Sequence, residues 1–333
     1  MTAGRPLLLI FGGGDGADQV TRSGQRTFVS GSTDLGRLLS DEVIRHRLVV
    51  NREFFTRPRP LDFNGYPVIA NMITEAERSG ELLRNVQKLL NGYRGHLLNP
   101  PAAVLRTRRD EVAQMLAGIE GLLVPAVVRL QGGDPALSAR ALEEAGIVPP
   151  VIVRETGTHT GQTVRLCHTI AEAADGLESG KEYIATQFVD FASADGLYRK
   201  YRVYFIGQGT VLRHMYVSDH WNVHSADRAR FMGPRPEVIA EERALIERAQ
   251  PFDVSAREVF SAVRERMPLD FFGLDFARLP HGRVLLFEAN ATISFFPLWR
   301  DSNPEFQYLT QCLPPARTAF MEMVGMTVPD PIV

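Results

Sequence analysis

The residues best suited to do chemistry are two acids and an amide near the end of the chain. Two apolar segments, 271–278 and 283–290, flank a Leu-Pro-His-Gly turn and are predicted to form a hairpin. If the His-Gly pair is a two-residue turn, Asp275 lies opposite Glu288, and Asn290 lies two residues further along the same face. A four-residue turn would keep this register. The spacing therefore gathers three oxygen-bearing side chains at one place.

Two opposed carboxylates repel each other and would destabilise a hairpin unless a cation lies between them. Carboxylate and amide oxygens suit Mg²⁺, and nucleotide phosphates can complete its coordination shell. The alternative is that both acids face solvent, each paired with a surface Arg or Lys. Their neighbours Phe272, Phe276, Leu286 and Phe287 are apolar, which argues against an open face. The hairpin therefore predicts a magnesium site.

The elements that must position this hairpin indicate an α/β fold. A buried strand is predicted at 7–11, followed by strands at 48–51 and 67–70 and a helix over 73–90. This alternation is typical of an α/β first lobe that ends near residue 101. Further strands are predicted at 126–130, 151–154, 183–189, 201–206 and 211–217, and helices at 107–116, 135–145, 237–249 and 255–266.

Composition excludes several classes of function. The 333 residues carry 37 Lys and Arg against 39 Asp and Glu, a formal net charge of −2, so no basic field favours nucleic acid or an anionic membrane. No apolar run approaches the ~20 residues of a membrane span. The two cysteines, Cys167 and Cys312, are expected to be buried thiols in a reducing compartment. We expect a cytoplasmic protein.

Gly273-Leu-Asp275 followed by Phe287-Glu-Ala-Asn290 resembles the metal-binding signature of ATP-grasp enzymes, which include glutathione synthetase and the ribosomal-protein glutamate ligases. In that family an acid on one strand and Glu-x-Asn on the next hold two magnesium ions on ATP. The resemblance implies a three-lobed ATP-grasp fold, with ATP between the middle and C-terminal lobes. The lobes are expected at residues 1–101, 102–185 and 186–333.

The resemblance extends back to residue 98 and implies a set of phosphate-binding groups. Arg109 fits the basic residue at the entry to the middle lobe, with Arg108 as the alternative. Arg154 stands where the family usually has a phosphate-binding Lys. The segment Gly157-Thr-His159-Thr-Gly161 matches the glycine-rich flap over the phosphates. All of these lie in the expected middle lobe.

The C-terminal lobe completes the implied nucleotide site. Gln187, Phe188 and Val189 match the hinge whose backbone hydrogen-bonds adenine, and Arg202 matches a phosphate-contacting Arg. Lys200 stands where many relatives have an acid, so Asp195 or Asp190 is suggested for the ribose. The Tyr-Arg-Lys-Tyr-Arg segment that ends at Arg202, and His-Trp-Asn-Val-His at 220–224, resemble a bacterial branch of the superfamily more than the named ligases.

Other residues leave two interpretations open. His214 alternates onto the strand face expected for Arg202, where it either contacts phosphate or substrate or is a hydrogen-bonded structural histidine. Gly12-x-Gly14-x-x-Ala17 fits a loose dinucleotide motif, but the polar residues that follow favour a tight turn. The Arg-rich loop around Arg57 is expected to be solvated, with carboxylate binding as the minor alternative.

The implied activity is an ATP- and Mg²⁺-dependent ligase that joins a carboxylate to an amine through an acyl phosphate. Two ions are expected, and Mn²⁺ is expected to substitute. The carboxylate belongs to a small molecule or a peptide, and a homodimer is the default oligomer. Two rivals remain: an ATP-grasp kinase, and a non-catalytic nucleotide-binding module. The second is suggested by Arg154 and by Tyr216, which stands where the family tends to have a second Arg.

Overall fold

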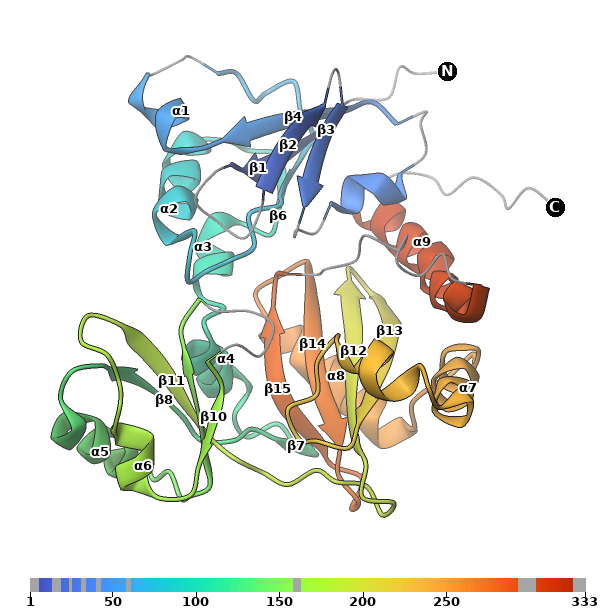
Figure 1. Ribbon diagram of the computed structural model, residues 1–333. Coiled ribbons are helices and arrows are strands. Elements are labelled where there is room, and N and C mark those ends of the chain that lie inside the picture. The colour runs from blue at the N-terminus through green and yellow to red at the C-terminus, as the bar shows by residue number, and fades with distance from the viewer. Residues whose placement is uncertain are drawn as a thin grey trace.

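The structure is a computed structural model. It describes residues 6–13, 19–23, 26–30, 34–39, 43–57, 61–157, 163–292 and 304–325. Three sheets dominate it, one above and two below in Figure 1, and a two-stranded hairpin accompanies the upper sheet. This is the mixed α/β architecture that the sequence predicts. No helix of the described part is long and apolar enough to cross a membrane.

The N-terminal sheet is parallel. Its strands, in spatial order, are β4 (Arg45–Val50), β1 (Leu7–Gly12), β5 (Val68–Asn71) and β6 (His96–Leu98). Every residue of β1 is buried, because alternate side chains enter two different cores. One core holds α2 (Gly80–Leu89) and α3 (Pro101–Leu105), and the other holds η1 (Leu35–Leu38) and α9 (Leu313–Met323). The predicted strands at 7–11, 48–51 and 67–70 are confirmed.

The predicted helix over 73–90 begins late, at Gly80. The side chain of Asn71 accepts a hydrogen bond from the Ile73 N–H (3.0 Å) and donates one to the Ile73 carbonyl (3.3 Å), which turns the chain away from helical geometry. Residues 72–79 therefore form a loop at the carboxyl end of β5. A short helix, α1 (Arg52–Thr56), follows β4 where a loop was predicted.

Strands β2 (Gln19–Ser23) and β3 (Arg26–Ser30) pair as an antiparallel hairpin. In the described part of the chain, β1 is therefore followed by strands and not by the helix on which a dinucleotide motif depends. Gly14 and Ala17 lie outside the described residues. This order argues against a dinucleotide site after β1.

The middle sheet is antiparallel. Its spatial order is β10 (Arg165–Cys167), β9 (Val151–Glu155), β11 (Glu182–Gln187) and β8 (Val127–Gln131). Helices α5 (Pro135–Glu144) and α6 (Ile170–Ala174) cover one face, where Val151 and Val153 are buried. Because side chains alternate along a strand, Arg154 lies on the opposite face.

The C-terminal sheet carries the predicted hairpin. Its spatial order is β13 (Gly209–Ser218), β12 (Tyr198–Ile206), β14 (Phe271–Arg278), β15 (Val284–Asn290) and β7 (Leu122–Leu123). Helix α8 (Val254–Arg266) covers one face, with Phe260 against Phe205 and Phe276. Asp275 alternates with these apolar residues and lies on the other face. The elements π-helix η2 (Arg228–Met232), α7 (Pro236–Ile246) and η4 (Pro304–Cys312) pack beside β13.

Asn99 joins the N-terminal sheet to the C-terminal one. Its φ of 46° lies in the left-handed region, which asparagine tolerates better than most residues. Its side chain donates to the Phe271 carbonyl (2.8 Å) and accepts from the Asp270 N–H (2.8 Å). The lobe boundaries at residues 101 and 185 stay predictions, and β7, within the expected middle lobe, pairs with β15. Both cysteines are free and buried, as expected.

Candidate active site

Asp275 lies directly opposite Glu288 in the β14–β15 ladder, as predicted. The route to this register differs from the prediction. The turn is one residue longer than expected, because Leu279 donates its N–H to the Arg283 carbonyl (2.9 Å) across a three-residue loop. A bulge then shifts the register between Asp275 and Phe276 and restores the expected opposition. The two-residue turn was wrong, but the two deviations cancel.

The bulge leaves Phe287 as the extra residue of β15. Its carbonyl accepts a hydrogen bond from Nη1 of Arg109 at 3.2 Å, and a second nitrogen of Arg109 bonds to Glu288. A bulge frees backbone groups from the ladder and re-aims the neighbouring side chain. Arg109 is the first residue of α4 (Arg109–Leu116), so the start of this helix is fixed to the acid pair.

Asp275 is 1% exposed and is held by two cations. Arg202, its neighbour across the β12–β14 ladder, donates to both carboxylate oxygens, with Nη2 at 2.7 Å from Oδ2. Lys200 approaches from two residues earlier on the same strand face, with Nζ at 3.0 Å from the same Oδ2. Burial raises the pKa of Asp275, but the two cations outweigh it and hold that pKa below its ordinary value. Asp275 is therefore ionised.

Glu288 is more accessible, with a side chain 21% exposed. Burial raises its pKa, and so does Asp275, but Arg109 and Arg202 prevail and keep the pKa low. Nη2 of Arg202 lies 3.6 Å from Oε1 of Glu288, so one guanidinium serves both acids. The acids do pair with Arg and Lys, as the alternative to a metal site supposed, but in the interior and not on an open face.

Arg154 adds a fourth cation. The Arg109 guanidinium and then burial lower the pKa of Arg154 to about 10, while Glu288 and Glu75 act in the opposite direction. Two guanidinium groups repel each other, and such a pair is stabilised by an anion that both can contact. Four cations therefore lie near three acids, Asp275, Glu288 and Glu75, where β9 of the middle sheet approaches the β14–β15 hairpin.

His214 lies opposite Arg202 in the β12–β13 ladder. It is 6% exposed, and its ring stacks on Tyr216 with centroids 4.0 Å apart. Burial, and after it Arg202 and Arg213, push the pKa of His214 well below its ordinary value. The imidazole is therefore neutral at neutral pH. It ends a row of side chains that runs across four strands from His214 through Arg202 and Asp275 to Glu288.

No protein-family model and no curated protein sequence matches the chain. Solved structures do. A RimK domain ATP-grasp protein from Sphaerobacter thermophilus is 12% identical, with TM-score 0.52 over 96% of this chain and 99% of that one. An N5-carboxyaminoimidazole synthetase from Staphylococcus aureus, complexed with ADP, is 12% identical, with TM-score 0.54 over 99% and 79%. The macrocyclase MdnC from Microcystis aeruginosa, bound with its precursor peptide MdnA, is 11% identical, with TM-score 0.52 over 96% and 99%.

The chain has the ATP-grasp fold. At 11–12% identity the similarity establishes the fold alone. Any chemistry must therefore be inferred from the residues of this chain. Within the described residues, no three His, Cys, Asp or Glu side chains gather as a metal site. The hairpin offers two carboxylates and the Asn290 amide. Asn290 Oδ1 accepts from the Thr292 N–H at 2.9 Å and keeps a second lone pair. These hard oxygen donors, partly exposed at Glu288 and Asn290, fit magnesium.

Two backbone N–H groups of the predicted adenine hinge already donate hydrogen bonds within the protein. Gln187 donates its N–H to the Ala126 carbonyl (2.9 Å), and Phe188 donates to Pro150 (2.8 Å). An adenine bound here must therefore be read by other backbone groups, those of Val189 among them. The Phe188 ring meets Trp221 edge to face at 5.7 Å.

Asp195 is not brought together with the other predicted residues. Arg199 bonds both its oxygens, lowers its pKa to about 2 and also binds Glu241. Arg199 alternates with Lys200 and so lies on the opposite face of β12 from the cluster. Asp195 lines a surface cavity of about 430 Å³ there. Its predicted ribose contact stays a prediction without support from this placement.

The flap is described only at its base. Gly157 has a φ of 69°, which glycine adopts without strain. A β-carbon there would meet the Arg78 side chain at 3.4 Å. His159 and Gly161 lie outside the described residues. Arg78, from the loop 72–79, thus lies beside Gly157.

The loop 72–79 was missed by sequence reasoning. The hydroxyl of Thr292 lies 2.9 Å from Glu75 Oε1 and 3.0 Å from Thr74 Oγ1, so the loop contacts the strand exit two residues after Asn290. Glu77 binds Arg129 of the middle sheet at 2.7 Å. The available signal was a polar run at the carboxyl end of a buried parallel strand, where α/β sheets bind ligands.

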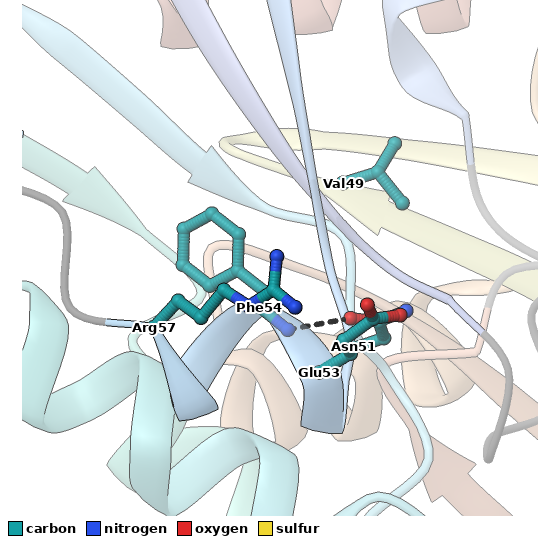
Figure 2. A pocket seen from close by; sticks show the side chains of 5 residues that line it. All are labelled: Val49, Asn51, Glu53, Phe54 and Arg57. Carbon is teal, nitrogen blue, oxygen red and sulfur yellow. Dashed lines mark hydrogen bonds between the residues drawn. The ribbon is translucent and has the colours of Figure 1, made fainter.

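A smaller cavity, about 200 Å³, lies at the carboxyl end of β4 (Figure 2). Asn51 caps α1 there by accepting the Phe54 N–H at 2.8 Å. Glu53 and Arg57 place opposite charges on its lining, so Arg57 faces a pocket and not only solvent. None of the clustered cations and acids lines this cavity.

Proposed function

We propose that the chain is an ATP-grasp ligase that uses ATP and magnesium to join a carboxylate to an amine. The observation that carries the proposal is the charge imbalance at the hairpin. Among the described residues, Lys200, Arg202, Arg109 and Arg154 lie near three carboxylates, those of Asp275, Glu288 and Glu75. A partly buried excess of positive charge is stabilised when a polyanion occupies the site. A triphosphate between the middle and C-terminal sheets meets that need.

Each group has a distinct task in this proposal. Arg109 and Arg154 neutralise phosphate oxygens, and Arg202 orients both acids. Glu288 and Asn290 hold magnesium, with Asp275 as the adjoining acid. Bound there, magnesium supplies neutralisation of charge on the transferring phosphoryl group. Catalysis then consists of positioning and electrostatic stabilisation, which is the general pattern for phosphoryl transfer.

The reaction needs no covalent nucleophile from the protein. A substrate carboxylate oxygen attacks the γ-phosphorus, the bond to the β-phosphate oxygen breaks, and ADP leaves. The amine then attacks the acyl carbon, loses a proton and expels inorganic phosphate. In the described residues the cluster holds arginines, a lysine and ionised acids, and His214 is buried and neutral. Such groups stabilise developing charge, which fits this route.

The substrates are proposed as classes. The solved relatives include a macrocyclase bound with a precursor peptide and a D-Ala:D-Ser ligase from Enterococcus faecalis. A peptide or small-molecule carboxylate and an amine acceptor are therefore both compatible with this fold. Incubation with ATP and paired carboxylates and amines distinguishes a ligase from a kinase. Free phosphate with an amide supports the ligase, whereas a phosphorylated product supports the kinase.

The Arg109–Arg154 pair gives a direct test. We expect the purified chain to bind a non-hydrolysable ATP analogue in a magnesium-dependent way, and Arg154→Met to weaken binding at least tenfold because one phosphate contact is lost. Arg140→Met is the matched control, since Arg140 is exposed on α5 and pairs with Glu144. Calorimetry measures both. Absence of analogue binding by the unaltered chain, or equal affinity in Arg154→Met, would refute the proposal.

A further inference from the structure

The carboxylate of Asp275 is more fully paired with cations of the protein than the carboxylate of Glu288. Both oxygens of Asp275 accept hydrogen bonds from Arg202, and Oδ2 also faces the Lys200 ammonium at 3.0 Å. The residue is 1% exposed. Glu288 has one oxygen bound to Arg109, and the other lies 3.6 Å from Arg202. Ligand positions therefore remain at Glu288 and Asn290, while Asp275 is enclosed by fixed cations.

One of the two cations beside Asp275 is an ammonium, a group that is uncommon in this chain. Only Lys88, Lys181 and Lys200 are lysines among 37 Lys and Arg residues. An ammonium is a compact, strongly hydrated point charge, whereas a guanidinium is a broad planar donor. Of the two, the ammonium is closer to a metal ion, because its charge is concentrated at one point.

We propose that the Lys200 ammonium occupies the place of a divalent cation at Asp275, so that the chain binds ATP with a single metal ion, held by Glu288 and Asn290. The inference rests on the proposed function. A second divalent ion on Asp275 would have to lie in contact with Lys200 and Arg202, and like charges at that separation repel strongly in a buried site. Lys200 thus carries permanently the charge that a second ion would bring.

Metal stoichiometry tests this directly. The purified chain is mixed with a non-hydrolysable ATP analogue, and Mn²⁺ binding is counted by electron paramagnetic resonance and calorimetry. We expect one Mn²⁺ per chain. Lys200→Met keeps most of the length of the side chain but removes the ammonium charge, which leaves Arg202 as the one remaining cation on Asp275, and we expect a second Mn²⁺ per chain. Lys200→Arg, which keeps the charge, should still bind one.

Lys181→Met is the matched control. Lys181 pairs with Glu178 at 3.0 Å and Glu155 at 3.2 Å, the same kind of contact away from the cluster, and its loss should leave one Mn²⁺ per chain. Two ions in the unaltered chain overturn the inference without any variant. One ion in a folded Lys200→Met chain overturns it as well, because Lys200 would then be a structural partner only. A chain that binds no analogue at all refutes the proposed function instead, and the inference with it.

Discussion

Two clusters of acids and arginines lie along the C-terminal sheet, and they are built differently. The first surrounds Glu242 of α7, which is 0% exposed. Arg228 binds both its oxygens, at 2.7 and 2.8 Å. The Met215 N–H donates to one oxygen at 2.9 Å, and the Tyr308 hydroxyl donates to the other. One acid meets one cation, and the neutral donors satisfy what remains.

The second cluster surrounds Asp275 and Glu288, and there the charges do not balance. Cations from β12, α4 and β9 outnumber the acids, and Arg109 and Arg154 lie close enough for one to lower the pKa of the other. Glu288 is also one-fifth exposed.

A closed and balanced cluster needs nothing further, so it is a structural element. An open cluster with excess positive charge is complete only with an anion. The contrast thus separates a packing role from the binding role that we propose for the second cluster.

The largest expected effect on stability is at the balanced cluster. Glu242→Gln leaves Arg228 buried without its counter-charge, and we expect the free energy of unfolding to fall by about 3–5 kcal/mol. Urea denaturation measures the loss. Glu241→Gln, the next residue on α7, removes a surface partner of Arg199 and should lower stability by about 1 kcal/mol or less. Nucleotide binding by the folded Glu242→Gln chain should be unchanged. A loss of binding in this variant would contradict the distinction between a structural cluster at Glu242 and a binding cluster at Asp275 and Glu288.

The opposite response is expected at the unbalanced cluster. Glu288→Gln removes a proposed metal ligand, so we expect ADP formation from ATP to fall by roughly 10²–10³-fold. Stability should change little, because the substitution relieves repulsion with Asp275 while Arg109 keeps the Phe287 carbonyl as a partner. Turnover assays with Glu81→Gln, an exposed acid paired with Arg52, provide the control. Full turnover by Glu288→Gln would show that the hairpin acids have a structural role and do not bind the metal.

Much of the fold was readable because strands leave local signals. The continuous apolar run at 7–11 predicted a buried strand, and the two apolar segments around the Leu-Pro-His-Gly turn predicted the β14–β15 hairpin. The helix at 73–90 was predicted too long because one side chain, Asn71, overrides helical spacing through bonds to Ile73. Such hydrogen bonds form because Asn71 is the last residue of strand β5, and the spacing of apolar residues in the sequence does not reveal them.

The sequence could predict the part of the site that lies on a single strand pair. It could not predict the contacts between segments that are distant in the chain. Asp275 and Glu288 share a hairpin, so their opposition followed from the sequence, although the bulge did not. Thr74 and Glu75 meet Thr292 only after distant segments pack together, and no local pattern encodes that contact. Lys200 could be placed on the face of Arg202 by alternation, but its contact with Asp275 needed the register between two separate strands.

A smaller effect is expected from pH at the shared edge of the two clusters, where His214 lies. Its pKa is depressed in the folded chain, so the unfolded chain binds a proton first as pH falls below about 6.5. Stability should therefore decrease with falling pH, by at most about 1.4 kcal/mol per pH unit from this group. Asn does not titrate, so His214→Asn should flatten the slope between pH 7 and pH 5 in urea denaturation. An unchanged slope would show that His214 titrates alike in the folded and unfolded chains. Weaker nucleotide binding at pH 7 would assign it a contact with the ligand.

The smallest effect concerns how the N-terminal lobe supports the open cluster. Thr292 bonds Asn290 through its N–H and Thr74 and Glu75 through its hydroxyl. Thr292→Val removes only the hydroxyl, and we expect a loss of about 1 kcal/mol in stability. If the loop aligns Asn290 for the metal, the Mg²⁺ concentration that half-saturates turnover should also rise several-fold, with turnover at saturating Mg²⁺ little changed. Thr292→Ser keeps the hydroxyl and should restore the Mg²⁺ requirement. The balanced cluster has no such dependence on another lobe, since Glu242, Arg228 and Tyr308 all come from elements packed beside β13. A loss of stability with an unaltered Mg²⁺ requirement would show that the contact between the loop 72–79 and Thr292 is structural and does not align Asn290.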